Sequence, residues 1–195
     1  VAMANKHKYA MVIDLTRCVG CQSCTVSCKF ENHAPKGFFR TWVSDHEIGR
    51  YPNTRREFLP QLCNQCDNPA CVPVCPVKAT WKDDNGVVVI DKSKCIGCGA
   101  CVKACPYGDR FLDPVKKKAD KCDFCFRRIE QGLQPACVET CVGGARIFGD
   151  LADPASQVSQ LASSKDAKVL NPGSGTRPQV FYIGLDHAIE HTPVH

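Results

Sequence analysis

The chain has 195 residues, a formal net charge of +5 at neutral pH and 44% hydrophobic residues, with a mean hydropathy of −0.22. This length suits one large domain or two small ones with a modest core, and the composition is typical of a soluble protein. No run approaches the roughly 20 apolar residues that a membrane-spanning helix needs. The only compact basic tract, Lys116–Lys118, indicates a solvated loop, and the mild charge gives no indication of a nucleic-acid partner.

The first residue is Val1 rather than a start methionine, so we expect that upstream residues were removed or are not included. The first apolar run of strand length is Tyr9–Asp14 (YAMVID), and a second one, Gly86–Asp91 (GVVVID), lies in the middle of the chain. Each predicted strand leads into a cysteine-rich loop. The segment after each third cysteine suits a short helix, which Pro76 and Pro106 then end.

Three segments lie outside the cysteine-rich loops. Residues 29–62 contain an aromatic cluster and a basic pair. Residues 126–136 form an insertion, for which we predict a helical turn that ends near Gly132. Residues 149–195 form a tail without cysteine that ends in a strand-like QVFYIGL stretch. We expect this tail to contribute little core and to wrap over the body of the protein or over a partner.

The sixteen cysteines form four groups of four, so none is left over as a free or catalytic thiol. In chain order the groups are Cys18, Cys21, Cys24 and Cys28; Cys63, Cys66, Cys71 and Cys75; Cys95, Cys98, Cys101 and Cys105; and Cys122, Cys125, Cys137 and Cys141.

The groups repeat in pairs. VIDLTRCVGCQSCTVSC at residues 12–28 returns as VIDKSKCIGCGACVKAC at 89–105, and PACVPVC at 69–75 returns as PACVETC at 135–141. Groups one and three therefore resemble each other, as do groups two and four. We interpret this as a two-cluster unit present twice, because internal similarity of this kind usually sets the architecture.

Disulfides and zinc are the other common uses of many cysteines. Bridges within a group would close only short loops and stabilise little, although bridges between groups are geometrically possible. A tetrahedral zinc site takes two Cys-x2-Cys pairs and has no use for further cysteines at this spacing. The run C-x2-C-x2-C-x3-C-P is typical of bacterial ferredoxins, whose fourth cysteine ligates the other cluster of a pair. Group three has it in full with Pro106, and group one has Lys29 in place of the proline.

Groups two and four, with wider internal spacings, complete the ligand count for four 4Fe–4S clusters. Gly20, Gly97 and Gly99 allow the loops to curl around a cluster, which also turns backbone N–H groups toward the sulfurs. Exchange of fourth cysteines can pair adjacent groups or nested ones. Only 19 residues separate groups two and three, against 34 between groups one and two, so the nested pairing fits better.

We therefore predict an α+β fold built from two nested bacterial-ferredoxin-like pseudo-repeats, each made of short βαβ units around its clusters, with inserted loops. Residues 1–37 with 113–148 form one unit and bind two clusters through groups one and four. Residues 54–112 form the other and bind two clusters through groups two and three. Residues 149–195 form the C-terminal wrapping tail.

Nearly the whole chain resembles the iron–sulfur electron-transfer subunits of molybdenum respiratory oxidoreductases, the four-cluster ferredoxins. The resemblance rests on YAMVIDLTRCVGCQSC, LCNQCDNPACVPVCP, ADKCDFCFRRIEQGLQPACVETC, GARIFGDLADP and GTRPQVFYIGL. Together these motifs are similar to those of tetrathionate, polysulfide and thiosulfate reductases. The sequence CVGGARIFGDL favours the tetrathionate type, because relatives of the polysulfide type usually have Cys-Pro where this chain has Cys141-Val142.

The resemblance implies the nested assignment of ligands to clusters. The implied sets are Cys18, Cys21, Cys24 and Cys141; Cys28, Cys122, Cys125 and Cys137; Cys63, Cys66, Cys71 and Cys105; and Cys75, Cys95, Cys98 and Cys101.

The family also implies a role in anaerobic respiration. As a subunit that is not an enzyme on its own, the chain would relay electrons between an integral-membrane quinone-reactive subunit and a molybdopterin-containing catalytic subunit. It would lie as a peripheral subunit on the periplasmic or extracytoplasmic face of the cytoplasmic membrane. The alternatives are a free-standing polyferredoxin shuttle, or the same subunit in a formate dehydrogenase, dimethyl sulfoxide reductase or nitrite-reduction pathway. A catalytic cluster would need an iron without a protein thiolate, which sixteen ligands for four clusters do not leave.

The remaining polar residues show no site pattern. The six histidines are scattered, so we expect surface positions and no haem; they are His7, His33, His46, His187, His191 and His195. Three lysines near cysteines favour solubility over a role in raising cluster potentials; they are Lys29, Lys94 and Lys103. Trp42 and Trp81 suit either core packing or a partner surface.

Overall fold

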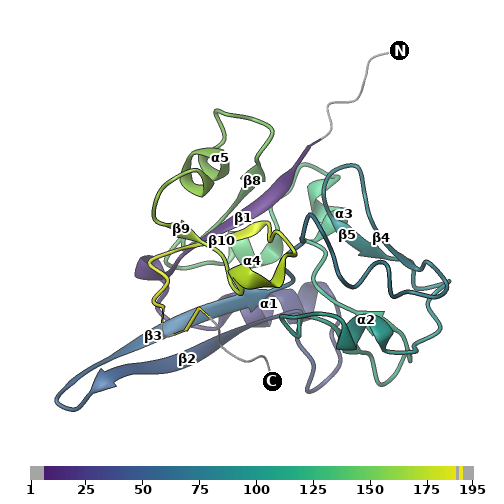
Figure 1. Cartoon of the computed structure of the whole chain (residues 1–195), viewed down its shortest axis with the longest axis horizontal. Coiled ribbons are helices and arrows are strands. Elements are labelled where there is room, and N and C mark those ends of the chain that lie inside the picture. The colour runs from purple at the N-terminus through teal and green to yellow at the C-terminus, as the bar shows by residue number, and fades with distance from the viewer. Residues whose placement is uncertain (1–6, 188, 191–195) are drawn as a thin grey trace.

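The computed structural model describes residues 7–187 and 189–190, so His191, His195 and residues 1–6 of the first predicted unit lie outside it. Figure 1 shows the arrangement of the elements. The strands are β1 (Tyr9–Asp14), β2 (Thr41–Arg50), β3 (Asn53–Leu62), β4 (Thr80–Lys82), β5 (Val88–Ile90), β6 (Phe111–Leu112), β7 (Ala119–Asp120), β8 (Arg146–Asp150), β9 (Ala167–Lys168) and β10 (Val180–Ile183). The helices are η1 (Leu15–Arg17), α1 (Ser23–Glu31), α2 (Ala100–Lys103), α3 (Phe126–Ile129), α4 (Ala136–Glu139), α5 (Gln157–Ala162) and η2 (Pro172–Ser174).

The largest sheet has the strand order β8-β1-β10-β9 and is centred on β1, whose bounds match the sequence prediction. Side chains alternate between the two faces of a strand, so an apolar run such as this one needs cover on both faces. On one face Met11 and Ile13 join the main core, and on the other Ala10 and Val12 pack in a second cluster with Val158 of α5. These four residues of β1 are fully buried.

The tail supplies part of this core, contrary to the sequence expectation. β10 pairs in parallel with β1, with Met11 opposite Val180 and Ile13 opposite Tyr182. Val180 and Tyr182 are fully buried, and the Tyr182 hydroxyl donates to the Pro60 carbonyl at 2.9 Å. The expectation of little core was wrong because it rested on the polar composition of the whole tail. The four residues of β10 are enough to form an inner strand of the sheet.

Residues 41–62 form a long antiparallel hairpin, β2 and β3, which the sequence analysis did not predict. It extends away from the body of the molecule (Figure 1). Its base packs into the core through Leu59 and Leu62, whereas Tyr51 at the tip is 93% exposed. Cys63 follows directly on β3, so the buried end of the hairpin positions the second cysteine group.

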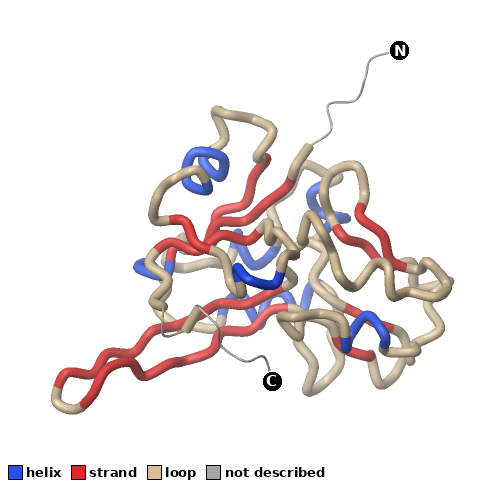
Figure 2. Tube along the Cα trace, in the orientation of Figure 1, coloured by secondary structure: helices blue, strands red, loops and turns tan. Residues whose placement is uncertain are grey.

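Residues 63–120 contain little regular structure, as the tan loops in Figure 2 show. The predicted strand at Gly86–Asp91 is present as the shorter β5, which pairs with β4. Short helices contain the third cysteines of groups one, three and four, broadly as predicted, whereas Cys71 of group two lies in a turn. The α3 helix gives the predicted turn before Gly132. The apolar cluster here is small and is built from Cys71, Ala79, Val88, Cys95, Cys101 and Ala119.

The structure is thus a mixture of strands and short helices. β1 lies in a four-stranded sheet and β5 in a two-stranded one, so the strand pairing differs between the sequence repeats. The pseudo-repeats and the division into units remain predictions. Within the described residues, no helix has the length and apolar character needed to cross a bilayer.

Candidate iron–sulfur cluster sites

The first cavity is lined by four cysteines, Cys18, Cys21, Cys24 and Cys141, and has about 340 Å³ of empty space that is partly open to solvent. Cys24 lies on α1 and Cys141 follows α4. The two helices pack together, and the Thr140 hydroxyl donates to the Ser27 hydroxyl at 2.8 Å.

The second cavity is lined by Cys28, Cys122, Cys125 and Cys137 and has about 270 Å³ of empty space. The same two helices serve both cavities. Side chains four residues apart lie on one face of a helix, so α1 offers Cys24 to the first cavity and Cys28 to the second. The α4 segment does the reverse, with Cys137 at the second and Cys141 at the first. The two cavities are therefore neighbours.

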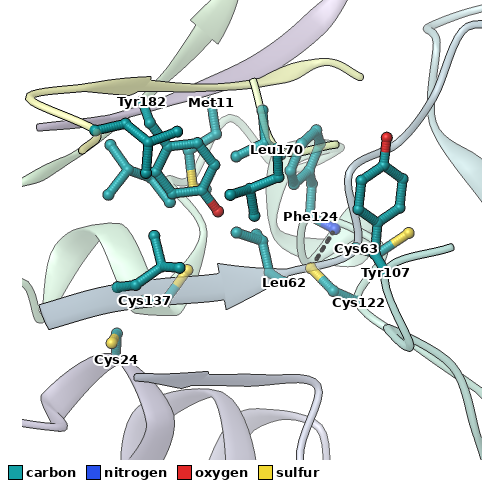
Figure 3. Packing of buried hydrophobic residues seen from close by; sticks show 14 of the residues in the cluster. Met11, Cys24, Leu62, Cys63, Tyr107, Cys122, Phe124, Cys137, Leu170 and Tyr182 are labelled. Carbon is teal, nitrogen blue, oxygen red and sulfur yellow. Dashed lines mark hydrogen bonds between the residues drawn. The ribbon is translucent and has the colours of Figure 1, made fainter. Parts of the chain in front are cut away.

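A third cavity of about 320 Å³ is lined by Cys63, Cys66, Cys71 and Cys105. In Figure 3, Cys24 and Cys137 lie to one side of Leu62, and Cys63 and Cys122 lie to the other. Cys122 of the second cavity and Cys63 of the third therefore lie on the same side of Leu62 in this view.

Three of the remaining four cysteines lie near the third cavity. Cys95 and Cys101 belong to the small apolar cluster, which also contains Cys71 of the third cavity, and Cys75 packs against it. Cys98 is exposed. The structure thus brings together all four residues of three predicted ligand sets and three residues of the fourth. The assignment of ligands to clusters stays a prediction, which this geometry supports.

Backbone N–H groups point at the cysteine sulfurs, as the curled loops predict. The N–H donors are Ala79 to Cys75 (3.2 Å), Ala145 to Cys141 (3.2 Å), Ala119 to Cys95 (3.4 Å) and Phe124 to Cys122 (3.4 Å). Gly97 has a φ of 72°, and a Cβ there would lie 2.2 Å from the Lys117 carbonyl oxygen. Only glycine allows the chain to pass this close, so the loop that carries Cys95 and Cys98 depends on it.

Burial raises the pKa of several thiols. It raises the pKa of Cys28, Cys66 and Cys105 to about 12 each, with neighbouring cysteines adding to the effect. By contrast, hydrogen bonds with Ser23 lower the pKa of the exposed Cys21. The buried thiols hold their protons when free, so they become thiolates only where a cation replaces those protons.

Two buried arginines line these cavities, and the sequence analysis missed both. Arg146 lines the first cavity and Arg110 lines the third, and each is 3% exposed. A signal was present in the sequence, because each arginine follows a fourth cysteine at the same interval, Cys105-x4-Arg110 and Cys141-x4-Arg146. The three lysines that the sequence analysis considered make other hydrogen bonds or lie at the surface. Lys29 donates to the carbonyls of Pro35 and Phe38, and Lys94 and Lys103 are exposed.

This donor set fits iron–sulfur clusters. All sixteen cysteines are free thiols, and twelve of them line three cavities that have N–H donors and positive charge in their walls. Within residues 7–187 and 189–190, no three His, Cys, Asp or Glu side chains are arranged to hold a single metal ion. Curled, sulfur-rich loops of this kind define an iron–sulfur protein of the ferredoxin type.

Comparison with known proteins agrees with this class. A family model described as a 4Fe–4S dicluster domain matches residues 54–151, and a 4Fe–4S binding domain model matches residues 15–31. The chain is 56% identical over 187 residues to the B subunit of tetrathionate reductase from Salmonella typhimurium, covering 94% of this chain and 75% of that protein. It is 48% identical to the B subunit of tetrathionate reductase from Archaeoglobus fulgidus, covering 94% and 85%. It is 38% identical to the B component of polysulfide reductase from Wolinella succinogenes, covering 90% and 94%.

The chain therefore belongs to the family of B subunits of reductases that carry 4Fe–4S dicluster domains. It binds 4Fe–4S clusters.

Proposed function

We propose that the chain is the electron-transfer subunit of a respiratory sulfur-compound reductase and that it carries four 4Fe–4S clusters. The proposal rests on how the fold groups the cysteines around cavities. Three cavities are each lined by the four cysteines of one predicted set, although each set draws on two distant parts of the sequence. Sixteen cysteines supply four ligands for each of four clusters and leave none for another role.

The proposed ligands are the sets that the nested pairing predicts. They are Cys18, Cys21, Cys24 and Cys141 for cluster I; Cys28, Cys122, Cys125 and Cys137 for cluster II; Cys63, Cys66, Cys71 and Cys105 for cluster III; and Cys75, Cys95, Cys98 and Cys101 for cluster IV.

When bound, such clusters accept and donate single electrons. The protein holds the four sites close together and largely shields them from water. Most of the cysteines are buried or half-buried, whereas Cys21 of site I and Cys98 of site IV are exposed. Exposed apolar side chains stand beside both, Val19 and Val142 around the first cavity and Ile96 next to the loop of Cys98. Sites I and IV are therefore the ends of the relay, where electrons enter and leave.

The partners follow from the relatives, which are named as B subunits of reductases. At one end we place a molybdopterin-containing catalytic subunit, and at the other an integral-membrane subunit that reacts with quinone. Tetrathionate reduction is favoured over polysulfide or thiosulfate reduction, because tetrathionate reductase subunits share 56% and 48% of their aligned residues with this chain. We place the protein on the extracytoplasmic face of the cytoplasmic membrane, where it performs no catalysis on its own.

The proposal is tested on protein purified without air together with whatever copurifies from its native membrane. We expect about 16 iron atoms and as many acid-labile sulfides per chain, because each of four clusters contributes four of each. We also expect a molybdopterin-containing subunit in the same complex. A fully loaded monomer without partners would favour the free shuttle, and protein without labile sulfide would refute the function altogether.

The ligand sets are tested by pairs of substitutions. Cys24→Ala and Cys141→Ala are expected to remove the same cluster signal from the electron paramagnetic resonance spectrum, and Cys28→Ala and Cys137→Ala a different one. An adjacent pairing of groups one and two predicts instead that Cys28 shares a signal with cysteines of residues 63–71.

A further inference from the structure

Arg146 is buried at the boundary between sites I and II. Its side chain lines the first cavity, while one terminal nitrogen, Nη1, lies 3.6 Å from the Cys137 sulfur of site II. The other, Nη2, donates to the Thr41 hydroxyl at 2.7 Å. Thr41 is the first residue of β2, and its hydroxyl donates across the hairpin to the Gln61 carbonyl at 2.6 Å. The threonine therefore fixes the guanidinium in place.

Arg110 occupies the corresponding place between sites III and IV. It lines the third cavity, and its charge acts on Cys71 and Cys63 of site III and on Cys101 of site IV. Its Nη2 donates to the Thr80 hydroxyl at 3.1 Å. Thr80 is the first residue of β4 and donates across that hairpin to the Val89 carbonyl at 2.7 Å. The same arrangement of arginine, threonine and hairpin thus occurs twice.

Neither arginine forms an ion pair with a carboxylate among the described residues, although the buried Asp109 interacts electrostatically with Arg110. Within the described residues 7–187 and 189–190, no ion pair joins Arg110 or Arg146 to an acidic side chain, and the neighbouring Asp109 accepts from Asn64 instead. Arg40 shows the usual solution, because it is paired with Asp120 at 2.9 Å. In addition, Nε of both arginines and Nη1 of Arg110 have no hydrogen-bond partner in the part of the chain that the structure describes. A buried charge with unused donors needs an anion nearby.

The anions within reach are the cluster ligands of both sites in each pair. Arg146 acts electrostatically on Cys18 and Cys24 of site I and on Cys28, Cys122 and Cys137 of site II. Four thiolates per site create the negative charge that these arginines face.

We propose that Arg146 and Arg110 are potential-setting residues, each holding one permanent positive charge between the two clusters of a pair. The inference rests on the proposed function, because it needs clusters in all four sites. Uptake of one electron adds one negative charge to a site and requires no proton, since an arginine stays protonated throughout. A fixed positive charge favours that uptake, so it raises the potentials of both sites beside it. Arg146 therefore raises the reduction potentials of sites I and II, and Arg110 raises those of sites III and IV.

The test is a redox titration followed by electron paramagnetic resonance, on the full chain in its native complex. The variants are Arg146→Gln and Arg110→Gln, which keep a hydrogen-bond donor for the threonine but lose the charge. Arg146→Lys and Arg110→Lys are the matched controls that keep the charge. We expect each Gln variant to lower two of the four potentials, with a fall of about tenfold or more in the reduction constant, or 59 mV for one electron. The Lys variants should stay near the wild type.

The decisive result is which potentials move. The pair that falls in Arg146→Gln must stay unchanged in Arg110→Gln, and the reverse. Four unshifted potentials in fully loaded Gln variants would overturn the inference, as would the same two clusters moving in both. If a Gln variant loses iron, its Lys counterpart decides. If the Lys variant retains its iron and its wild-type potentials, the site needs the positive charge. If the Lys variant also loses iron, the arginine has a purely structural role. Wild-type protein without iron and labile sulfide would instead refute the proposed function.

Discussion

The part of the molecule built around the β8-β1-β10-β9 sheet and the part between Cys63 and Asp120 hold their cysteines in different ways. The first has a core of large side chains, among them Met11, Phe124 and Tyr182, and its cysteines line the edge of that core. The second has mainly Cys, Ala and Val in its apolar cluster, and its longest strands have three residues. Cysteine is therefore a minor component of the core in one part and supplies half of the buried residues of the apolar cluster in the other.

The contrast indicates where the clusters matter most for folding. A part with few large apolar side chains cannot offset the loss of chain entropy by burial alone, and metal ligation then supplies folding free energy directly. The sheet part retains buried apolar surface of its own. Specific polar contacts also join the two parts, so substitutions at these contacts can test the comparison.

Removal of iron is the largest perturbation. We expect an anaerobic chelator to abolish hydrogen-exchange protection in β4, β5 and α2, while β1, β8 and β10 keep part of theirs. Exchange measured by mass spectrometry on loaded and stripped protein checks this, and restoration of iron and sulfide is the control. Equal loss of protection in the two parts would mean that the sheet has no stability of its own.

Loss of Arg40 should break the strongest polar link between the parts. Arg40 binds Asp120 through two nitrogens, at 2.9 and 3.1 Å, with about a tenth of either side chain exposed. After Arg40→Met the partly exposed Lys92 still contacts the buried Asp120, so we expect a loss of about 3 kcal/mol, the lower end of the range for breaking a buried ion pair. This lowers the thermal unfolding midpoint of the loaded protein by roughly 2–4 °C per kcal/mol.

Lys92→Met is the matched control for Arg40. Lys92 contacts the same Asp120 oxygen at 2.6 Å, but its side chain is 42% exposed. We expect a cost below about 1 kcal/mol, because water screens such a pair. Equal effects of the two substitutions would contradict the assignment of Arg40 as the main link.

Gln65 is the second link, and its loss should have a smaller effect. This fully buried side chain donates to the Cys122 carbonyl and accepts from the Val88 N–H, both at 2.8 Å. Gln65→Leu leaves the Val88 N–H without its partner, whereas the Cys122 carbonyl still accepts from Lys121, so we expect a cost of about 1–3 kcal/mol. Thermal unfolding of the loaded protein measures this. Gln61→Leu is the control, because the Gln61 amide donates to Ser44 inside one hairpin and its loss should not uncouple the parts.

Tyr182→Phe tests a contact within the sheet part and has the smallest expected effect. The variant keeps the buried ring but removes the hydrogen bond to Pro60, which should cost about 1 kcal/mol. Tyr51→Phe at the exposed hairpin tip should leave the unfolding midpoint unchanged. A large loss in Tyr182→Phe would show that this hydroxyl, rather than ring burial, attaches the tail to the hairpin.

Features that depend on local spacing could be predicted from the sequence. β1 has the predicted bounds, α3 ends before Gly132, and Gly97 adopts the positive φ that the curled loop requires. The cysteine sets gather as the nested pairing predicts in three cavities. In each case the decisive residues lie within a few positions of one another, or they follow a ferredoxin spacing that is itself local.

Features that depend on contacts between distant residues could not be predicted from the sequence. The β2–β3 hairpin has no strong turn signal, since its tip reads Arg50-Tyr51-Pro52-Asn53. The β10 segment becomes a core strand only because β1 lies beside it. Arg110 and Arg146 lie at the same spacing from a cysteine, but nothing in that spacing indicates that both are buried and form no ion pair with a carboxylate among the described residues.

By itself, the sequence determined the kind of metal centre, because the intervals between thiols limit what a short loop can surround. Only the tertiary structure decided which distant strands share a sheet and which charges lie between the cavities. Those choices depend on burial of one segment against another, and burial is a property of the assembled chain rather than of any stretch of it.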